Sequence, residues 1–430
     1  MKYYNVIDFG ATADGSLCTK EIQSAIDACY IGGGGEVLIP QGEFIVAGLR
    51  IRSNVTLHLL EGAALVGSRN PEDYFAYLDD EIEPISKEER EHKCPSVLKS
   101  DCKSVYPYSR WNNAIIRAVR AKNIAIIGER NSRIDGRDCY DEQGEENYRG
   151  PHGINIWYCE NILLRGYSMY HSANWGHAIQ NSKNISVSGI SVFGGHDGFD
   201  IRTTDNTVIE DCIFETGDDC IAGFDNIGVV IRRCSLNSAC SLLRFGGTDV
   251  LVEDCRGYAP AKYGHRYNLS DEKKRAGSPT DENCRYNCLT VFLYYCDNRA
   301  RIRAIPGNIV IRNSSFDGID AIFNLPFGHK WSSNRSLKDI LFEKCDFTSL
   351  RLPINIVAPT EEPLSLTLEK CNISFCEDYG VAPLIRTSGH GNICLRDVKV
   401  VSGAPYIEAL TEGKIEITGS TQIDIKTAEM

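Results

Sequence analysis

The sequence contains no run of about 18 consecutive apolar residues, which is the length that a helix needs to cross a bilayer. It begins MKYYNVIDFG, without the apolar stretch of a secretory signal. We therefore expect no membrane partner and a cytoplasmic location. Positive charge is also scarce, with 46 Lys and Arg residues against 58 Asp and Glu residues and a net charge of −12. Because such a surface repels phosphate backbones, we expect no nucleic-acid partner.

Closely spaced cysteine pairs are missing as well. The chain has 18 cysteines but no C-x-x-C pair, the spacing that zinc sites and redox motifs usually need. We therefore predict no metal centre and no cofactor. Five cysteines instead end similar short segments (IEDC, IRRC, VEDC, FEKC and LEKC), namely Cys212, Cys234, Cys255, Cys345 and Cys371. Because a buried cysteine behaves as a small apolar residue, this recurrence predicts a stacked core position with reduced thiols.

Short strand-like segments that follow Asn or Asp recur about every 20 residues. They begin at Asn161, Asn184, Asn206, Asn226, Asp249, Asn308, Asp339 and Asn392. Strand chemistry with this period and without helical stretches predicts a solenoid. The L-x-x-L-x-L pattern of leucine-rich repeats is absent, so we predict an all-β, single-stranded parallel β-helix. Asparagine at each turn tolerates left-handed backbone angles and can bond to its neighbours in a ladder.

The rest of the chain fits one domain over residues 1–430, since no linker divides it. Residues 1–50 are expected to form an N-terminal cap and the first coils. Within them, residues 19–29 place four apolar side chains on one helical face, Ile22, Ala25, Ile26 and Cys29. Such a helix can cap the apolar end of a solenoid. The acidic run from Asp79 to Glu91 is interpreted as a solvated loop or short helix.

A second irregular stretch, residues 256–284, interrupts the repeat. Long excursions from a rigid scaffold often carry function, so we interpret it as an insertion loop at the active site.

Two acidic segments carry the chemistry, GHDGFD with Asp197 and GDDC with Asp218 and Asp219. Asp197 and Asp218 are 21 residues apart, so we expect them at the same place on adjacent coils. Carboxylates about 5 Å apart raise one another's pKa. Asp219 is displaced sideways, and Gly217 permits a break that lets both side chains emerge. This placement could give the separation of about 6.5–9.5 Å between acid and base of an inverting glycosidase. The alternative is that these aspartates cap turns.

Several stretches resemble the polygalacturonase-type glycoside hydrolases (family 28), which are pectin-degrading, right-handed parallel β-helix proteins. They are DFGA at Asp8, GGGEVLIPQG at Gly33, IDG at Ile134, the Asn174-Trp175 pair and the intact GDD at Gly217. The resemblance implies metal-independent hydrolysis of α-linked galacturonate chains with inversion. It further implies Asp219 as the general acid and Asp197 with Asp218 as a pair of bases.

The chain departs from this family in three places. His196 stands where the first motif begins Asn-Thr. One coil after Gly217 the family has a histidine, whereas this chain reads SACSLLRFGG from Ser238. The family's R-I-K clamp is matched only loosely by residues 301–303.

A uronic acid substrate needs a cation for its carboxylate, and arginine can bind that group with two hydrogen bonds. We expect Arg244 first, then His265 and Arg266, with His196 also at the substrate site. For each of them an ion pair with a neighbouring acid is the alternative.

The leading hypothesis is a cytoplasmic glycosidase for acidic, pectin-type oligosaccharides, in which the insertion could close the cleft into an exo-acting pocket. One alternative is a polysaccharide lyase whose aspartates bind Ca²⁺ while Arg202 or Arg244 removes a proton. The other is a non-catalytic, glycan-binding β-helix, which the missing histidine favours.

Overall fold

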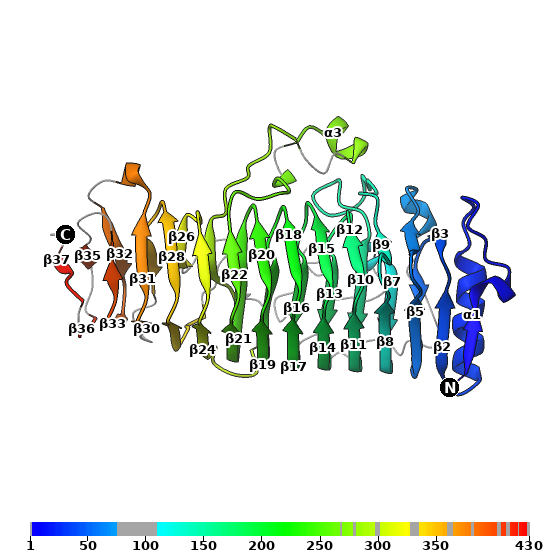
Figure 1. Ribbon diagram of the computed structural model, residues 1–430, viewed down its shortest axis with the longest axis horizontal. Helices are drawn as coiled ribbons and strands as arrows, with labels where there is room; N and C mark the ends of the chain where they lie inside the picture. The colour runs from blue at the N-terminus through cyan, green and yellow to red at the C-terminus, as the bar shows by residue number, and fades with distance from the viewer. Residues whose placement is uncertain are drawn as a thin grey trace.

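The computed structural model describes residues 2–74, 110–266, 269–277, 281–296, 302–326, 335–358, 364–379, 382–401, 406–409, 413–419 and 421–427. Over these residues the chain winds into an elongated parallel β-helix, with the termini at opposite ends (Figure 1). Each named strand pairs in parallel with its counterpart on the next coil, as β10 does with β13. The predicted all-β parallel β-helix is confirmed. The acidic run from Asp79 to Glu91 lies outside the described residues.

Each coil contributes up to three strands, which stack into three series along the helix. Series one consists of β4 (Leu49–Arg50), β7 (Ala114–Val119), β10 (His152–Trp157), β13 (His177–Gln180), β16 (Phe199–Arg202), the first parts of β19 (Ile221–Arg232) and β21 (Ser241–Glu253), β23 (Thr290–Tyr294), β26 (Ala321–Pro326), β29 (Ile354–Val357), β32 (Pro383–Ser388), β35 (Tyr406–Ala409) and β37 (Asp424–Thr427). Series two consists of β1 (Tyr3–Asn5), β2 (Gly35–Ile39), β5 (Val55–Leu59), β8 (Lys122–Gly128), β11 (Glu160–Arg165), β14 (Lys183–Ser188), β17 (Asp205–Glu210), the second parts of β19 and β21, β24 (Gly307–Arg312), β27 (Asp339–Glu343), β30 (Leu364–Glu369), β33 (Gly391–Arg396) and β36 (Ile415–Thr418). Series three consists of β3 (Gly42–Val46), β6 (Ala63–Gly67), β9 (Arg133–Asp135), β12 (Ser168–Tyr170), β15 (Ser191–Gly194), β18 (Ile213–Thr216), β20 (Ser235–Ser238), β22 (Arg256–Tyr258), β25 (Ser315–Asp317), β28 (Asp346–Leu350), β31 (Asn372–Phe375) and β34 (Lys399–Val400).

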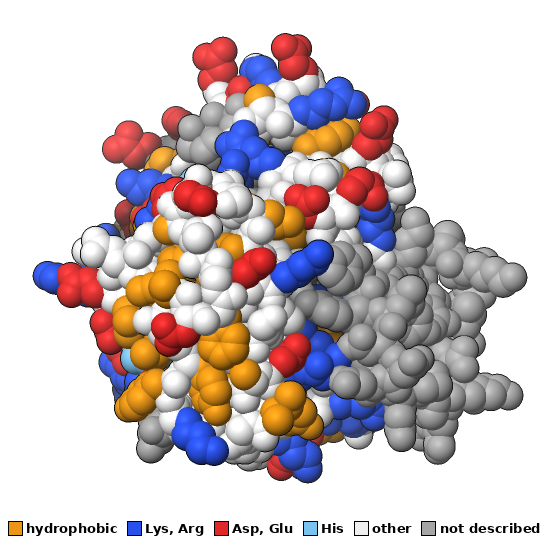
Figure 2. Space-filling model, turned by 90° about the vertical axis from the view of Figure 1, so that its right-hand side faces the viewer, with side chains coloured by type: hydrophobic (Ala, Val, Ile, Leu, Met, Phe, Trp, Pro, Cys, Tyr) orange, Lys and Arg blue, Asp and Glu red, His pale blue; other side chains and the backbone are white. Residues whose placement is uncertain are grey.

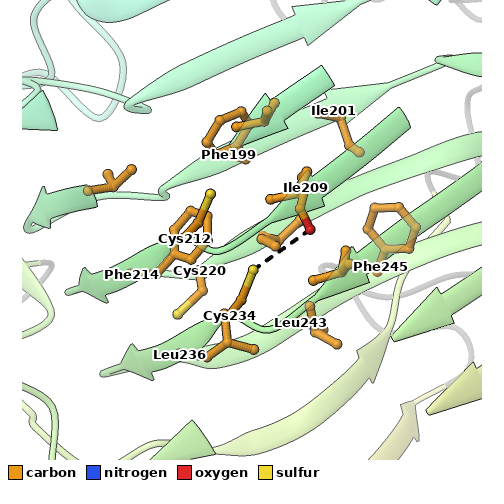
Figure 3. Close-up of a cluster of buried hydrophobic side chains, with 14 of the residues drawn as sticks. Phe199, Ile201, Ile209, Cys212, Phe214, Cys220, Cys234, Leu236, Leu243 and Phe245 are labelled. Atoms are coloured by element: carbon orange, nitrogen blue, oxygen red, sulfur yellow. Dashed lines mark hydrogen bonds between the residues drawn. The ribbon is translucent and has the colours of Figure 1, made fainter. Parts of the chain in front are cut away.

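The core consists of inward-facing apolar side chains stacked from coil to coil, and the recurring cysteines belong to it (Figure 3). Cys212, Cys234 and Cys255 occupy consecutive coils and are at most 3% exposed. Cys345 and Cys371 are fully buried. The cysteines of the described residues are free thiols. The predicted stacked cysteine position is therefore confirmed.

The predicted asparagine ladder runs along the turn before series two. Each side-chain amide donates to the Oδ1 of the asparagine on the preceding coil, at 2.8–3.2 Å, through Asn54, Asn123, Asn161, Asn184 and Asn206. All five have left-handed backbone angles, with φ between 54° and 62°.

The inclusion of Asn226 in this ladder was wrong. The register of β17 and β19 aligns Asn206 with Gly228, not with Asn226. Asn226 turns inward, where it accepts hydrogen bonds from Thr204 and donates one to the Ile201 carbonyl. It thereby satisfies buried backbone groups next to the irregular register between Gly223 and Asn226.

Helix α1 (Thr19–Ile31) covers the N-terminal end of the solenoid, as predicted. Its inward face carries Ile22, Ala25, Ile26 and Cys29, each fully buried. Apolar side chains also stay exposed among charged ones on this end of the molecule (Figure 2). The exposed large apolar residues of the first 31 positions are Tyr3, Ile7, Leu17, Tyr30 and Ile31. Among the described residues, no helix is both long and apolar enough to cross a membrane.

The interruption of the repeat begins three residues later than expected, because residues 256–258 form β22. The chain then leaves the coil and returns at β23, which starts at Thr290. This excursion, which we call the insertion, carries the short helix α3 (Asp271–Ala276) above the ends of the strands (Figure 1). The described part of the chain also forms helical turns at Val6–Phe9, Pro71–Asp73, Arg110–Asn112 and Glu377–Tyr379.

Candidate active site

The three candidate aspartates lie in two turns that join series three to series one. Asp197 lies between β15 and β16, and Asp218 and Asp219 lie between β18 and β19. Because the second turn does not continue the strand, consecutive residues need not point to opposite faces. One carboxylate oxygen of each aspartate lies within 4.8 Å of the others. The structure therefore brings the predicted trio together.

Gly217 makes this turn possible, because two backbones pass close to it. A Cβ at this position would lie 2.4 Å from the carbonyl oxygen of Gly264 and 2.7 Å from that of Gly195. The insertion carries Gly264, so the absence of a side chain at Gly217 lets the insertion lie directly against the acidic turn.

The stacking of the trio differs from the expected one by one residue. The step from β16 to β19 is 22 residues, since Phe199 pairs with Ile221. Continued backwards, this register aligns Asp197 with Asp219 and His196 with Asp218. The amide of Asp219 accordingly donates to Oδ1 of Asp197 at 3.2 Å. The expected 21-residue stacking of Asp197 on Asp218 is thus not observed.

The three carboxyl groups differ in pKa because their environments differ. Burial, and then the charges of Asp218 and Asp219, hold the pKa of Asp197 well above its ordinary value. Burial and the Asp218 charge raise the pKa of Asp219 to about 6. Burial also disfavours ionisation of Asp218, but attraction by His265, Arg149 and Arg244 outweighs it and lowers the Asp218 pKa. Below about pH 6 the trio therefore combines an ionised Asp218 with two neighbours that retain protons.

The trio is more compact than we expected from the sequence. The nearest oxygens of Asp219 and its two neighbours are no more than 4.8 Å apart, whereas the expected separation of acid and base was about 6.5–9.5 Å. The turn at Gly217 explains the difference, because it folds both side chains of the pair towards Asp197.

Arg244 extends from β21 towards this cluster. Its Nη1 lies 3.7 Å from Oδ2 of Asp219, and its guanidinium lies 3.8 Å from the ring centre of Tyr295. The side chain is 16% exposed. Burial opposes its charge, but Tyr295 and the aspartates raise its pKa, so Arg244 remains a cation.

Two histidines flank Asp218. His265, from the insertion, places Nε2 3.8 Å from Oδ2 of Asp218. His196 is 4% exposed and lies against the ring of Tyr148. Burial lowers the pKa of His265, and burial together with Arg149 and Arg266 lowers that of His196. Near pH 7 both rings are therefore neutral and offer hydrogen bonds, whereas in acid His265 gains the charge that attracts the Asp218 carboxylate.

Arg266 does not serve the substrate site in the expected way. Its guanidinium forms a buried pair with both oxygens of Asp138, at 2.9 Å for Nη2 to Oδ2, and the residue is 5% exposed. Because a buried carboxylate already takes these donors, Arg266 fastens the insertion to the loop between β9 and β10. Lys274 reinforces this contact by lying 4.4 Å from the ring centre of Tyr148.

Residues 301–303, the loose match to the family's R-I-K clamp, do not provide a free arginine among the described residues. Arg301 lies outside the described residues, and Arg303 bonds to Asp225 at 3.0 Å and to Asp205 at 2.7 Å. Asp200, which lies in β16, is 1% exposed and pairs with Arg202 through two hydrogen bonds of 2.5 and 2.8 Å.

Sequence reasoning missed three residues of the site, Arg149, Cys240 and Tyr295. Nη2 of Arg149 lies 3.4 Å from Oδ2 of Asp218. Cys240 stands 22 residues after Asp218, so the register step would have located it. No local pattern marks Arg149 or Tyr295, which reach the site from the loop between β9 and β10 and from the position directly after β23.

Two groups of described side chains could hold a cation. One is the aspartate trio, and the other combines Asp218, Cys240 and His265. In each group the donor atoms lie within 4.8 Å of one another.

A family model described as a right-handed β-helix region matches residues 108–256. A probable polygalacturonase of Vitis vinifera is 27% identical over 279 residues, which cover 59% of this chain and 53% of that protein. An exo-poly-alpha-D-galacturonosidase of Dickeya chrysanthemi is 25% identical over 51% of this chain and 41% of its own length. The chain thus spans about half, or less, of the curated relatives it matches.

The fold extends along most of a solved structure. The exopolygalacturonase of Thermotoga maritima superposes with a TM-score of 0.68 at 15% identity, covering 93% of this chain and 91% of that one. At this identity the likeness shows the fold alone. The shared fold and the sequence relatives both agree with the family resemblance that the motifs at Asp8, Gly33 and Gly217 indicated. The chain therefore folds as a right-handed parallel β-helix and is similar in sequence to polygalacturonases, as its motifs predicted.

Proposed function

We propose that this protein is an inverting glycosidase that acts on galacturonate-containing, pectin-type oligosaccharides. The observation that carries the proposal is the convergence of Asp197, Asp218 and Asp219 with their proton affinities held apart. Pairs of carboxyl groups with separated pKa values are the usual acid and base of glycoside hydrolysis. The relatedness to polygalacturonases supports the same reaction class.

In the proposed reaction Asp219 donates its proton to the glycosidic oxygen as the bond from the anomeric carbon to that oxygen breaks. A water oxygen forms the new bond to the anomeric carbon from the opposite side, and Asp218 takes the water's proton. Asp197, the other member of the predicted base pair, holds a proton because its pKa is raised, so it supports Asp218 rather than taking the water's proton; its Oδ1 accepts the amide hydrogen of Asp219. Proton exchange with solvent then restores both groups.

Asp219→Asn tests the acid. Loss of a general acid typically costs about 10²–10⁴-fold in rate. We expect a loss of that size in reducing-end release from galacturonate oligomers. The matched control is Asp211→Asn, because Asp211 is an exposed aspartate paired with Arg233 away from the cluster. Turnover by Asp219→Asn at the rate of that control would remove Asp219 from the mechanism.

The stereochemical part of the proposal needs its own test, because oxygens of the trio lie within 4.8 Å of one another, nearer the roughly 5 Å of a retaining pair than the roughly 6.5–9.5 Å of an inverting one. An α-linked substrate cleaved with inversion gives a β-configured product before mutarotation, which proton NMR detects in the first minutes. An α-configured first product would instead indicate a covalent intermediate on one of the aspartates.

Arg244 is proposed to bind the substrate carboxylate, supported by its permanent charge and partial exposure next to Asp219. A hydrogen bond to a charged group contributes about 1.5–3 kcal/mol. Arg244→Gln should therefore lower kcat/KM on galacturonate oligomers by about 10- to 150-fold, and much less on their methyl esters. An equal loss on both substrates would assign Arg244 to another task. His196 and His265 are proposed as neutral hydrogen-bonding partners of the sugar.

The insertion supports an exo-acting, short-substrate version of this activity. The insertion lies against Gly217 and is held there by the pair of Arg266 with Asp138. The insertion therefore covers the aspartate trio from one side. Two similar proteins also bear names of exo-acting enzymes. Release of single sugar units from a long oligomer is the expected product pattern, whereas an early mixture of lengths would indicate an open cleft.

The polysaccharide lyase remains the second candidate, because the aspartate trio could hold a hard cation. Its proposed bases are less suitable, since Arg202 is engaged by Asp200 and the Arg244 pKa is raised. Ultraviolet-absorbing, unsaturated products that disappear with chelator would identify a lyase. Saccharide binding without any cleavage would identify a glycan-binding protein.

We also propose a cytoplasmic location. The support is the chemistry of Cys212, Cys234 and Cys255, which remain free although they stack on consecutive coils. Reducing conditions preserve such thiols. Fractionation of the native cells checks this, and recovery of the protein with oxidised cysteines outside the cytoplasm would contradict it.

A further inference from the structure

Three side chains of different chemistry meet at one edge of the aspartate trio. Asp218 comes from the turn before β19, Cys240 from the turn before β21 and His265 from the insertion. A carboxylate oxygen, the sulfur and a ring nitrogen all lie within 4.8 Å of one another. Cys240 lies one register step beyond Asp218, so the fold stacks the thiol directly on the carboxylate.

This combination of donors suits zinc. Zinc binds thiolate, imidazole and carboxylate at about 2.0–2.3 Å, and sites that exchange ligands use three protein groups and keep the fourth position open. Tetrahedral geometry at these bond lengths places ligand atoms roughly 3.3–3.8 Å apart. The three donors therefore need to close by about 1.5 Å at most, and each of the three residues is only partly buried.

The charged groups around the three donors include arginines as well as acids. Arg149 lies near Asp218, but its guanidinium also bonds to Glu146 at 2.9 Å. Asp197 and Asp219 stand within 4.8 Å of Asp218. Arg244 also acts on Asp218, and Arg285 acts on His265, so charges of both signs surround the site.

We propose that Asp218, Cys240 and His265 form a binding site for a zinc-like divalent cation, and that a bound ion stops the hydrolytic reaction. Binding displaces the thiol proton to solvent and forms the metal–sulfur bond. The inhibition follows because the ion takes the carboxylate that should accept the proton of water. This inhibitory half rests on the proposed function, whereas the binding half does not.

Cobalt(II) added to the full-length, metal-free protein tests the binding half, because a cobalt–thiolate bond produces a charge-transfer band in the near ultraviolet. We expect one cobalt per chain with this band in the parent protein, and displacement of the cobalt by zinc. Cys240→Ser should abolish the band. His265→Gln should weaken zinc binding, measured against a chromophoric chelator, by more than the roughly 10-fold that loss of even an outer-shell partner causes.

The matched control is Cys376→Ser, which removes a free, partly buried thiol far along the chain. It should retain the band and the affinity. Thermal unfolding of each variant checks that it is folded, and Cys240→Ala provides a second replacement should the serine variant fail to fold. A missing band in the parent protein, a band that survives both Cys240 replacements, or calcium binding as tightly as zinc would each overturn the site.

The inhibitory half is measured as the ratio of each protein's rate with zinc to its own rate without zinc. We expect strong inhibition of the parent protein and relief in the Cys240 variants. Zinc that binds through Cys240 without slowing hydrolysis would overturn the inhibition alone. A protein without glycosidase activity would refute the proposed function and leave the cobalt result standing.

Discussion

Replacing Asp219 by asparagine should change the free energy of unfolding in a way that reports the charge of the aspartate cluster. This test does not depend on enzymatic turnover. Asp219 is 1% exposed, and burial together with the Asp218 charge raises its pKa from 3.8 to about 6. Asparagine has nearly the same shape, can accept the hydrogen bond that the Ser241 amide donates to Oδ1 at 3.0 Å, and carries no charge at any pH. The substitution therefore removes the cost of ionising a buried group.

The magnitude follows from the two pKa values. Below pH 3.8 Asp219 is protonated in both the folded and the unfolded chain. Between 3.8 and about 6 the unfolded chain ionises while the folded chain keeps its proton, so the parent protein loses stability as pH rises. The loss is complete above about pH 6 and amounts to about 3 kcal/mol, at 1.36 kcal/mol per pH unit. Asp219→Asn should thus be more stable than the parent by about 3 kcal/mol at pH 7.5, and by about half of that at pH 5.

Calorimetric unfolding at pH 5 and pH 7.5 measures this effect. An unfolding entropy of about 2.1 cal/mol/K per residue over 430 residues gives about 0.9 kcal/mol/K. The expected rise in Tm is therefore about 3 °C at pH 7.5 and clearly smaller at pH 5. Stability should increase while activity is lost, which is the pattern of a site that stores electrostatic strain.

Asp200→Asn is the matched control, because Asp200 is equally buried but forms two hydrogen bonds with Arg202. Breaking a buried ion pair costs about 3–5 kcal/mol, so this variant should be less stable than the parent at both pH values. A Tm of Asp219→Asn that stays at or below that of the parent at pH 7.5 would refute the reasoning about the cluster.

Three further predictions test the reaction and the scaffold. The rate of hydrolysis should fall as pH rises past about 6, because Asp219 then loses the proton that it must donate. On the acid side the rate should hold to below pH 3.8, because the pKa of Asp218 is lowered. An activity profile that stays flat to pH 8 would contradict the assigned acid. Phe245→Ala should lower the free energy of unfolding, measured with denaturant, by about 3–5 kcal/mol, because Phe245 is 1% exposed. Ile213→Ala should cost much less, because Ile213 is 42% exposed. Similar costs for the two variants would mean that the core is not packed as described. Asn184→Ala should lower stability by about 1–3 kcal/mol, because it loses the ladder hydrogen bonds and places alanine at a φ of 57°. Asn184→Gly should be more stable than Asn184→Ala, because glycine adopts this φ without strain. Equal Tm values for the two variants would exclude a backbone contribution.

The architecture was largely predictable because its signals are local and repeated. An asparagine that tolerates left-handed angles and a short β-branched strand recur along the chain, a buried cysteine recurs in five coils, and each repeat needs only its neighbours to bury its apolar face. The helix over residues 19–31 was also readable, since Ile22, Ala25, Ile26 and Cys29 share one face. The prediction failed at Asn226, where an irregular register moves the ladder position to Gly228.

The candidate site was only partly predictable. The motifs of Asp197 and Asp218 locate two turns, but the pattern of the sequence does not determine how many residues one coil contains. A step of 22 rather than 21 residues places Asp197 against Asp219 and stacks Cys240 on Asp218. A difference of one residue thus decides which side chains meet.

By itself, then, the sequence determined the coiled scaffold and the positions of the acidic turns, because strand and turn preferences act over a few residues. Only the tertiary structure decided which cations face the acids. Arg266 pairs with Asp138 across 128 residues of chain and leaves the substrate side, while the same insertion delivers His265 to Asp218. Such partners are chosen by the docking of a non-repeating segment, and no local pattern encodes that choice.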